Sequence, residues 1–185
     1  MRRGLLHLGL ITALVIGSVE ASARASGERL VEASPSLLPR PGALTGSVLN
    51  DRIRQRAQEA RRLAMRYLDH WSRREEVTSK HVQEFYAPTV RFHGRVVAPK
   101  DLLDEKRRFA RRWPLRDYSP LAKTMSIGCR ADAGECRVET SFSYRARNPV
   151  TGQSAKGYGL LQLVIDFASG RPLIISESSR VLRQS

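Results

Sequence analysis

A strict alternation of residue types between Cys136 and Arg147 constrains the fold of this chain more than any other feature. Apolar or small residues fill every second position, and most of the residues between them are charged or carry hydroxyls. Because successive side chains of a β-strand point to opposite faces, this pattern predicts a long strand with one buried face. The inward positions are Cys136, Val138, Thr140, Phe142, Tyr144 and Ala146. Residues 125–129, 159–167 and 173–182 are also strand-like, so we expect an antiparallel sheet.

The first half of the chain has helical periodicity. From Asn50, which we expect to cap the helix, apolar residues recur at intervals of three and four over about 25 residues, and arginines occupy the opposite side. A short helix is predicted to begin at Thr78 or Ser79 and to end before Pro88. Residues 90–97 read as a short strand pair around Gly94. A third helix is predicted from residue 99 to residue 113, between two prolines.

Helices followed by long antiparallel strands predict the α+β class, with about three helices packed on one face of a curved sheet. Over residues 50–182 the chain resembles the nuclear transport factor 2-like superfamily, which includes ketosteroid isomerases and polyketide cyclases. The resemblance rests on the long first helix, on the segment 85–94 (Phe-Tyr-Ala-Pro-Thr-Val-Arg-Phe-His-Gly) and on residues 99–114. It implies a cone in which the sheet wraps around a pocket and helices close the narrow end. Enzymes, ligand carriers and assembly domains share this fold, so it leaves the function open.

Four polar side chains have the right phase to face such a pocket. Glu177 is in step with the apolar residues of the last strand, and it either serves as a base or pairs with an arginine at the rim. Tyr144 shares the inner face of its strand and is otherwise a core residue with a satisfied hydroxyl. Lys106 is expected to extend past Phe109 to solvent. His93 ends a strand and either flanks a turn or acts as a general base.

We expect no catalytic residue among these groups, although Glu177, His93 and Tyr144 are weak candidates. The paired acidic donors that the isomerase resemblance implies have no counterpart on the last strands. No cofactor motif is present, and we expect no metal site, because the histidines lie on different elements without a carboxylate cluster beside them. The expected pocket lining is Tyr67, Trp71, Phe92, Lys106, Phe109, Trp113, Tyr144 and Glu177.

Residues 1–25 have the composition of a cleavable secretory signal. Two arginines precede an apolar stretch over residues 5–17, and small residues follow it. The tripeptide 23–25 (Ala-Arg-Ala) fits the pattern that signal peptidase recognises, and 21–23 (Ala-Ser-Ala) is the alternative site. The competing interpretation is an uncleaved anchor helix. We expect a periplasmic or secreted protein of a bacterial envelope, with a disordered linker over 26–49, one domain over 50–185, and no membrane span after cleavage.

The two cysteines support an oxidising compartment. Cys129 and Cys136 are separated by six residues and flank two predicted strands, so they can lie opposite each other in an antiparallel pair. An even cysteine count in an exported chain favours a disulfide, and the alternative is two buried thiols. The spacing matches neither a redox motif nor half of a zinc site.

The net charge of +14 invites an anionic partner. Its 27 arginines and five lysines are scattered over all elements, so a solvated basic surface and a dedicated polyanion site both remain open. Three function hypotheses follow. The first is a non-catalytic cone domain that binds a protein or envelope component, with a possible homodimer through the sheet face. The second is a small-molecule isomerase, dehydratase or hydrolase that uses Glu177 or His93. The third is a binder of an anionic polymer; nucleic acid is not the expected partner.

Overall fold

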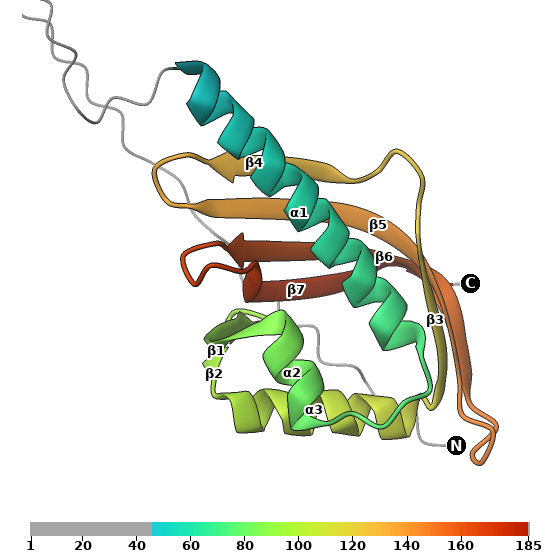
Figure 1. Ribbon diagram of the computed structural model, residues 1–185. Coiled ribbons are helices and arrows are strands. Elements are labelled where there is room, and N and C mark those ends of the chain that lie inside the picture. The colour runs from blue at the N-terminus through green and yellow to red at the C-terminus, as the bar shows by residue number, and fades with distance from the viewer. Residues whose placement is uncertain (1–45, 185) are drawn as a thin grey trace, which may run out of the picture. The chain divides into compact units, whose positions relative to one another are not determined.

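The computed structural model describes residues 46–184, so the predicted signal and the linker up to residue 45 lie outside the described residues. Three helices and seven strands form an α+β domain, which confirms the predicted fold class (Figure 1). The helices are α1 (Gly46–Ser72), α2 (Ser79–Phe85) and α3 (Pro99–Arg112). The strands are β1 (Tyr86–Phe92), β2 (Arg95–Val97), β3 (Leu115–Pro120), β4 (Ser126–Arg130), β5 (Glu135–Arg147), β6 (Ser154–Asp166) and β7 (Leu173–Gln184).

The sheet is mixed, whereas the sequence predicted an antiparallel one. The strand order is β2-β1-β7-β6-β5-β3, and β4 pairs with β5 beside β3. Every pair is antiparallel except β1 and β7, which run parallel with Phe92 opposite Glu177. An alternating pattern reports the two faces of a strand but not the direction of its neighbour, so the sequence carried no signal for this pair. The parallel pairing places the end of β1 beside the middle of β7.

α1 runs diagonally across one face of the sheet and packs against β3, β4 and β5 (Figure 1). Its buried stripe follows the predicted spacing and consists of Ala60, Leu63, Ala64, Tyr67, Leu68 and Trp71. The helix begins at Gly46, so the prediction that Asn50 caps it is wrong. An asparagine inside a helix costs only a few tenths of a kcal/mol, and the helix therefore continues through it.

The β4–β5 pair places Cys129 directly opposite Cys136, and a disulfide joins them. Cys136 is fully buried in the core, so the bond ties the outer strand β4 to the centre of the domain. Among the described helices, none combines the length and the apolar character that a membrane span requires.

A tight turn connects β1 and β2. His93 and Gly94 are its two central residues, and both have positive φ angles, 47° and 83°. Positive φ at both positions is the signature of a type I′ turn, the form that best matches the twist of a two-residue hairpin. The turn lies beside β7, because the backbone N–H of His93 donates to the carbonyl of Glu177 over 2.8 Å.

Candidate functional site

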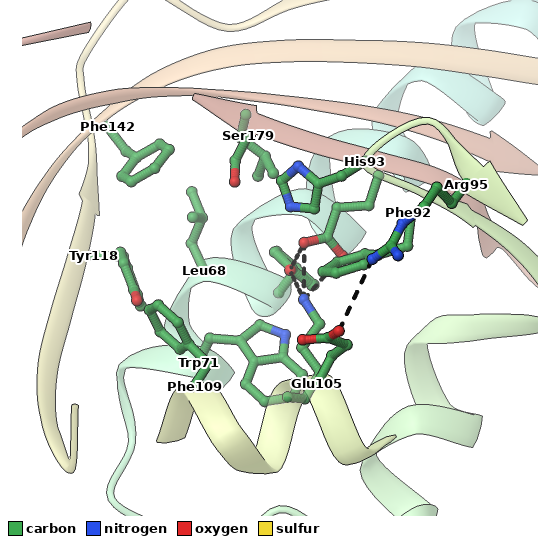
Figure 2. A pocket seen from close by; sticks show the side chains of 14 residues that line it. Leu68, Trp71, Phe92, His93, Arg95, Glu105, Phe109, Tyr118, Phe142 and Ser179 are labelled. Atoms are coloured by element: carbon green, nitrogen blue, oxygen red, sulfur yellow. Dashed lines mark hydrogen bonds and ion pairs between the residues drawn. The ribbon is translucent and has the colours of Figure 1, made fainter. Parts of the chain in front are cut away.

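An open cavity of about 410 Å³ lies between α1, α3, the β1–β2 turn and the strands β6 and β7 (Figure 2). One part of its wall is apolar and mostly aromatic: Leu68, Trp71, Phe92, Phe109, Tyr118, Phe142 and Leu161. The other part is polar: Tyr67, His93, Arg95, Glu105, Lys106, Glu177 and Ser179. A cavity with an apolar wall and a few convergent polar groups is the usual form of a small-molecule site.

A buried ion pair stands at the polar end. Lys106 and Glu177 are only 8% and 3% exposed, and the ammonium Nζ lies 2.8 Å from Oε1 and 3.0 Å from Oε2 of the carboxylate. Lys106 comes from the buried side of α3, four residues after the fully buried Leu102. Glu177 comes from the inner face of β7, opposite Phe92. The partner of Glu177 is therefore Lys106 and not the expected arginine at the rim.

Two tyrosines complete the coordination of the carboxylate. The hydroxyl of Tyr67 donates to Oε1 of Glu177 over 2.7 Å, and the hydroxyl of Tyr86 donates to Oε2. Lys106 also donates to the Tyr67 hydroxyl over 2.8 Å. Each carboxylate oxygen thus accepts from the ammonium and from one phenol, which leaves Glu177 little capacity to accept a further proton.

Aromatic rings surround the ammonium as well. The Nζ atom of Lys106 lies 4.8–5.5 Å from the ring centroids of Tyr67, Trp71, Tyr86 and Phe92. Ring faces attract a cation electrostatically, so they replace part of the hydration that Lys106 loses on burial. The prediction that Lys106 passes Phe109 to reach solvent is wrong, because its place in the helical stripe directs it inward.

The environment keeps this cluster in one protonation state. Burial by itself raises the pKa of Glu177, but the Lys106 ammonium and the hydrogen bonds from Lys106, Tyr86 and Tyr67 hold it below its ordinary value. Burial and the negative charge of Glu177 raise the pKa of both tyrosines well above the usual range. Burial lowers the pKa of Lys106, while the negative charge of Glu177 and the hydrogen bond to it oppose that shift and favour the ammonium. The carboxylate, the ammonium and the two neutral phenols together carry no net charge.

His93 stands at the mouth of the cavity, where it remains exposed, and its imidazole faces the interior (Figure 2). Partial burial against the wall lowers its pKa, so the ring is neutral at neutral pH. Within the described residues no hydrogen bond joins this imidazole to Glu177, although both side chains line the cavity. That the two residues form no catalytic pair stays a prediction.

Six of the eight residues expected to line the pocket do line it, namely Tyr67, Trp71, Phe92, Lys106, Phe109 and Glu177. Trp113 and Tyr144 lie outside the lining. Trp113 follows the last turn of α3, where its ring packs against the guanidinium of Arg112. Tyr144 lies two residues beyond Phe142 on β5, and only the Phe142 ring reaches the cavity.

Two features of the site were missed by sequence reasoning. The Tyr86 hydroxyl was not assigned a role, because a tyrosine at a helix–strand junction is usually read as core. The indole nitrogen of Trp71, whose ring lines the cavity, is itself buried and has no hydrogen-bond partner within the described residues. A usable signal did exist: one lysine in the apolar stripe of a helix and one glutamate in the apolar face of a strand point to a buried pair.

A possible metal-ligand set lies elsewhere, at the junction of α1 and α2. His70, Glu75 and His81 offer ligand atoms within 4.8 Å of one another, although the sequence reading placed no carboxylate beside these histidines. The Nδ1 atom of His81 accepts a hydrogen bond from the backbone N–H of Thr78 over 3.2 Å. The neutral ring then carries its proton on Nε2, and this tautomer opposes binding of a cation through that atom.

No family model matches the sequence, and no curated protein matches it. Solved structures do match. A nuclear transport factor 2-like superfamily protein from Salmonella enterica serovar Typhimurium is 11% identical, over 76% of this chain and 96% of that one, with a TM-score of 0.57. A candidate scytalone dehydratase from Novosphingobium aromaticivorans is 10% identical, over 75% and 90%, with a TM-score of 0.59. A candidate dehydratase of the same fold family from Streptomyces avermitilis is 8% identical, over 71% and 99%, with a TM-score of 0.58.

These likenesses and the open, curved sheet define the nuclear transport factor 2-like cone fold. The fold predicted from the sequence is thereby confirmed.

Proposed function

We propose that this chain is an exported cone domain that binds a small, mainly apolar molecule in its pocket and releases it unchanged. The observation that carries the proposal is the open, aromatic-walled cavity whose ionic side chains pair with one another, Lys106 with Glu177 and Arg95 with Glu105. Such a wall favours an uncharged ligand, because no free charge in the interior would compensate a charged one.

Binding is favoured over catalysis by the state of Glu177. A general base must accept a proton from its substrate, and it works best with a pKa near the operating pH. Glu177 has a lowered pKa, and three donors occupy its oxygens. The group is thus a structural anion at the end of the cavity.

Export is supported by the composition of residues 1–25 and by the disulfide between Cys129 and Cys136. Disulfides persist in oxidising compartments such as the periplasm. We therefore place the protein in the periplasm or outside the cell, where the component of the envelope that it serves would supply or receive the ligand.

The pocket is tested with N-phenyl-1-naphthylamine, a neutral aromatic probe that becomes fluorescent in apolar surroundings. We expect Ser179→Trp to weaken probe binding at least tenfold, because Ser179 lies on the cavity lining. Ser178→Trp is the matched control, since the side chain of Ser178 points to the opposite face of β7, where it bonds Gln162. Equal binding by both variants, or no binding by the wild type, would refute the proposal.

Acid–base catalysis by His93 is the second candidate. It is favoured by the neutral imidazole at the cavity mouth and by the likeness to candidate dehydratases. The test is loss of water from 3-hydroxycyclohexanone, followed by the absorbance of the enone product. We expect no rate above buffer. A wild-type rate that disappears in His93→Asn would establish the enzyme instead, because asparagine tolerates the positive φ of this turn and removes only the imidazole.

A further inference from the structure

Arg116 is a buried charge without a counter-charge. Four polar or charged side chains are buried in the part of the chain that the structure describes: Lys106, Arg116, Thr140 and Glu177. Lys106 and Glu177 satisfy each other, and the Thr140 hydroxyl lies 3.3 Å from that of Thr124. Arg116 is 7% exposed, yet no acidic side chain within the described residues pairs with it.

The guanidinium of Arg116 also keeps donors to spare. One terminal nitrogen donates to the carbonyl of Trp113 over 3.1 Å, while Nε has no partner within the described residues. A guanidinium carries five N–H donors. Because Nε is itself buried, the donors left for a ligand are those of the two terminal nitrogens. Burial of an unpaired charge is expensive, and buried charges in proteins are therefore usually paired.

The space in front of Arg116 can admit such a partner. A hollow of about 550 Å³ lies over β3, β5 and β6, outside the cone pocket, and shares no lining residue with it. Across the sheet, Arg116 is opposite Ala146, and Ala146 is opposite Ala155. These two small side chains line the hollow and leave room beside the guanidinium.

A second arginine reaches the same place. Arg74, in the loop after α1, lines this hollow and also a neighbouring one of about 540 Å³, and Arg116 lines both. Asp117 also lines the first hollow, although its side chain points to the opposite face of β3 from Arg116, because successive residues of a strand alternate between the two faces. The acids Glu75 and Glu76 line only the neighbouring hollow. Both Arg74 and Arg116 thus line the first hollow, and its basic residues outnumber its one acid, Asp117.

We propose that Arg116 and Arg74 form a binding site for a phosphoryl group. The planar donor fork of arginine matches two oxygens of a phosphate at once, and hydrogen bonds between ionised partners are the strongest kind. The phosphoryl group belongs either to a free phosphate or to the headgroup of an anionic phospholipid. The site lies outside the cone pocket, so a negative result at one of the two sites does not contradict the proposal for the other.

The test uses the mature chain and inorganic phosphate as the probe, with chloride at equal ionic strength as the reference. We expect phosphate to raise the melting temperature of the wild type above the chloride value. Arg116→Met should abolish this rise and, without phosphate, should melt at the wild-type temperature or higher. That second result is expected because an apolar residue in place of an unpaired buried charge is neutral or stabilising.

Arg74→Gln keeps the test decisive if Arg116→Met fails to fold, because Arg74 is exposed. It should weaken phosphate binding at least tenfold by calorimetry. Arg73→Gln is the matched control, with the same loss of charge one residue away but outside both hollows, and it should bind as the wild type does. A phosphate effect equal to that of chloride, or equal weakening by both variants, would overturn the proposal.

The source of the phosphoryl group is read from vesicles of phosphatidylcholine with and without phosphatidylglycerol. Binding to the anionic vesicles that Arg116→Met or Arg74→Gln removes, and Arg73→Gln keeps, indicates a lipid headgroup. Binding of inorganic phosphate without vesicle binding indicates a free phosphate. Vesicle binding that survives in all three variants comes from the general basic surface and contradicts a lipid source at this site.

Discussion

The Lys106–Glu177 pair is a case in which desolvation and attraction nearly cancel. Each ion loses several kcal/mol of hydration on burial, and the pair recovers this only through good geometry and further hydrogen bonds. Here the phenols of Tyr67 and Tyr86 and the ring of Trp71 provide those additional contacts. Because attraction only offsets the cost of desolvation, the pair as a whole adds little stability. Each ion nevertheless needs the other, because either one alone would be a buried charge without a counter-charge.

We predict that the single variants Lys106→Met and Glu177→Gln each lose about 3–5 kcal/mol of unfolding free energy. Lys106→Met leaves the buried carboxylate of Glu177 without its counter-charge. Glu177→Gln does the same to the buried ammonium of Lys106. The double variant should lose less than the sum of the two, since it removes both charges together. Urea unfolding of the four proteins measures the coupling, and strictly additive losses would show that the pair does not interact.

The same pair predicts a pH dependence. Because the pKa of Glu177 is lower in the folded protein than its ordinary value of 4.5, the unfolded chain binds the proton more readily. The stabilisation is therefore complete above that ordinary value and is lost as the pH falls through the lowered one. Denaturant titrations from neutral to strongly acidic pH should show this loss, and the Lys106→Met/Glu177→Gln double variant should lack that component. An identical acid profile in both proteins would contradict the prediction.

The β4–β5 hairpin is the element that the disulfide holds in place. Cys129 and Cys136 close an eight-residue loop, and loop entropy assigns such a link about 2–3 kcal/mol. We predict that the Cys129→Ser/Cys136→Ser variant melts at a lower temperature but still folds, because β5 remains paired with β3 and β6. Reductant should lower the melting temperature of the wild type and leave that of the variant unchanged. A wild type insensitive to reductant under denaturing conditions would argue against the bond.

The β5–β6 pair contains a close contact between a ring and a backbone. Gly159 lies opposite Phe142, and a Cβ atom added there would stand 2.5 Å from the ring of Phe142. Because that ring also lines the cone pocket, Gly159→Ala must push it away from β6. We predict a loss of about 1–3 kcal/mol and altered binding of N-phenyl-1-naphthylamine. Gly128→Ala is the control, since a Cβ there meets open space; equal effects of both variants would contradict the contact.

The elements themselves could be predicted from the sequence, because their periodicity is a local property. The alternation of β5 and the apolar stripe of α1 identified both buried faces correctly. The parallel pairing of β1 with β7 was missed, since it joins segments far apart in the chain. The position of Glu177 in the apolar pattern of its strand, and that of Lys106 in its helix, predicted that both residues lie at or near the interior. These local patterns could not show that the two side chains contact each other. A contact between α3 and β7 depends on the curvature of the sheet, which no local pattern encodes.

On the scale of the whole molecule, the compartment is the property most open to direct test. We predict that protein recovered from the envelope of its host begins at Ser26, or at Arg24 if the earlier site is cleaved. Either form is expected to have a lower positive charge than the full chain, because residues 1–25 contain three arginines and one glutamate. Mass spectrometry of the intact protein measures the start, and a molecule that still begins at Met1 in that fraction would refute cleavage.

The position of β7 within the sheet also determines when the sheet can be completed. β7, the most C-terminal of the described strands, is not at an edge of the sheet but lies between β1 and β6. Until residues 173–184 are available, β1 and β6 each present an open edge, and the carboxylate that Lys106 requires is missing. If the chain crosses a membrane from its N-terminus, as proposed above, the sheet would be complete only after residues 173–184 have crossed. In that case the pocket would close only on the far side of the membrane.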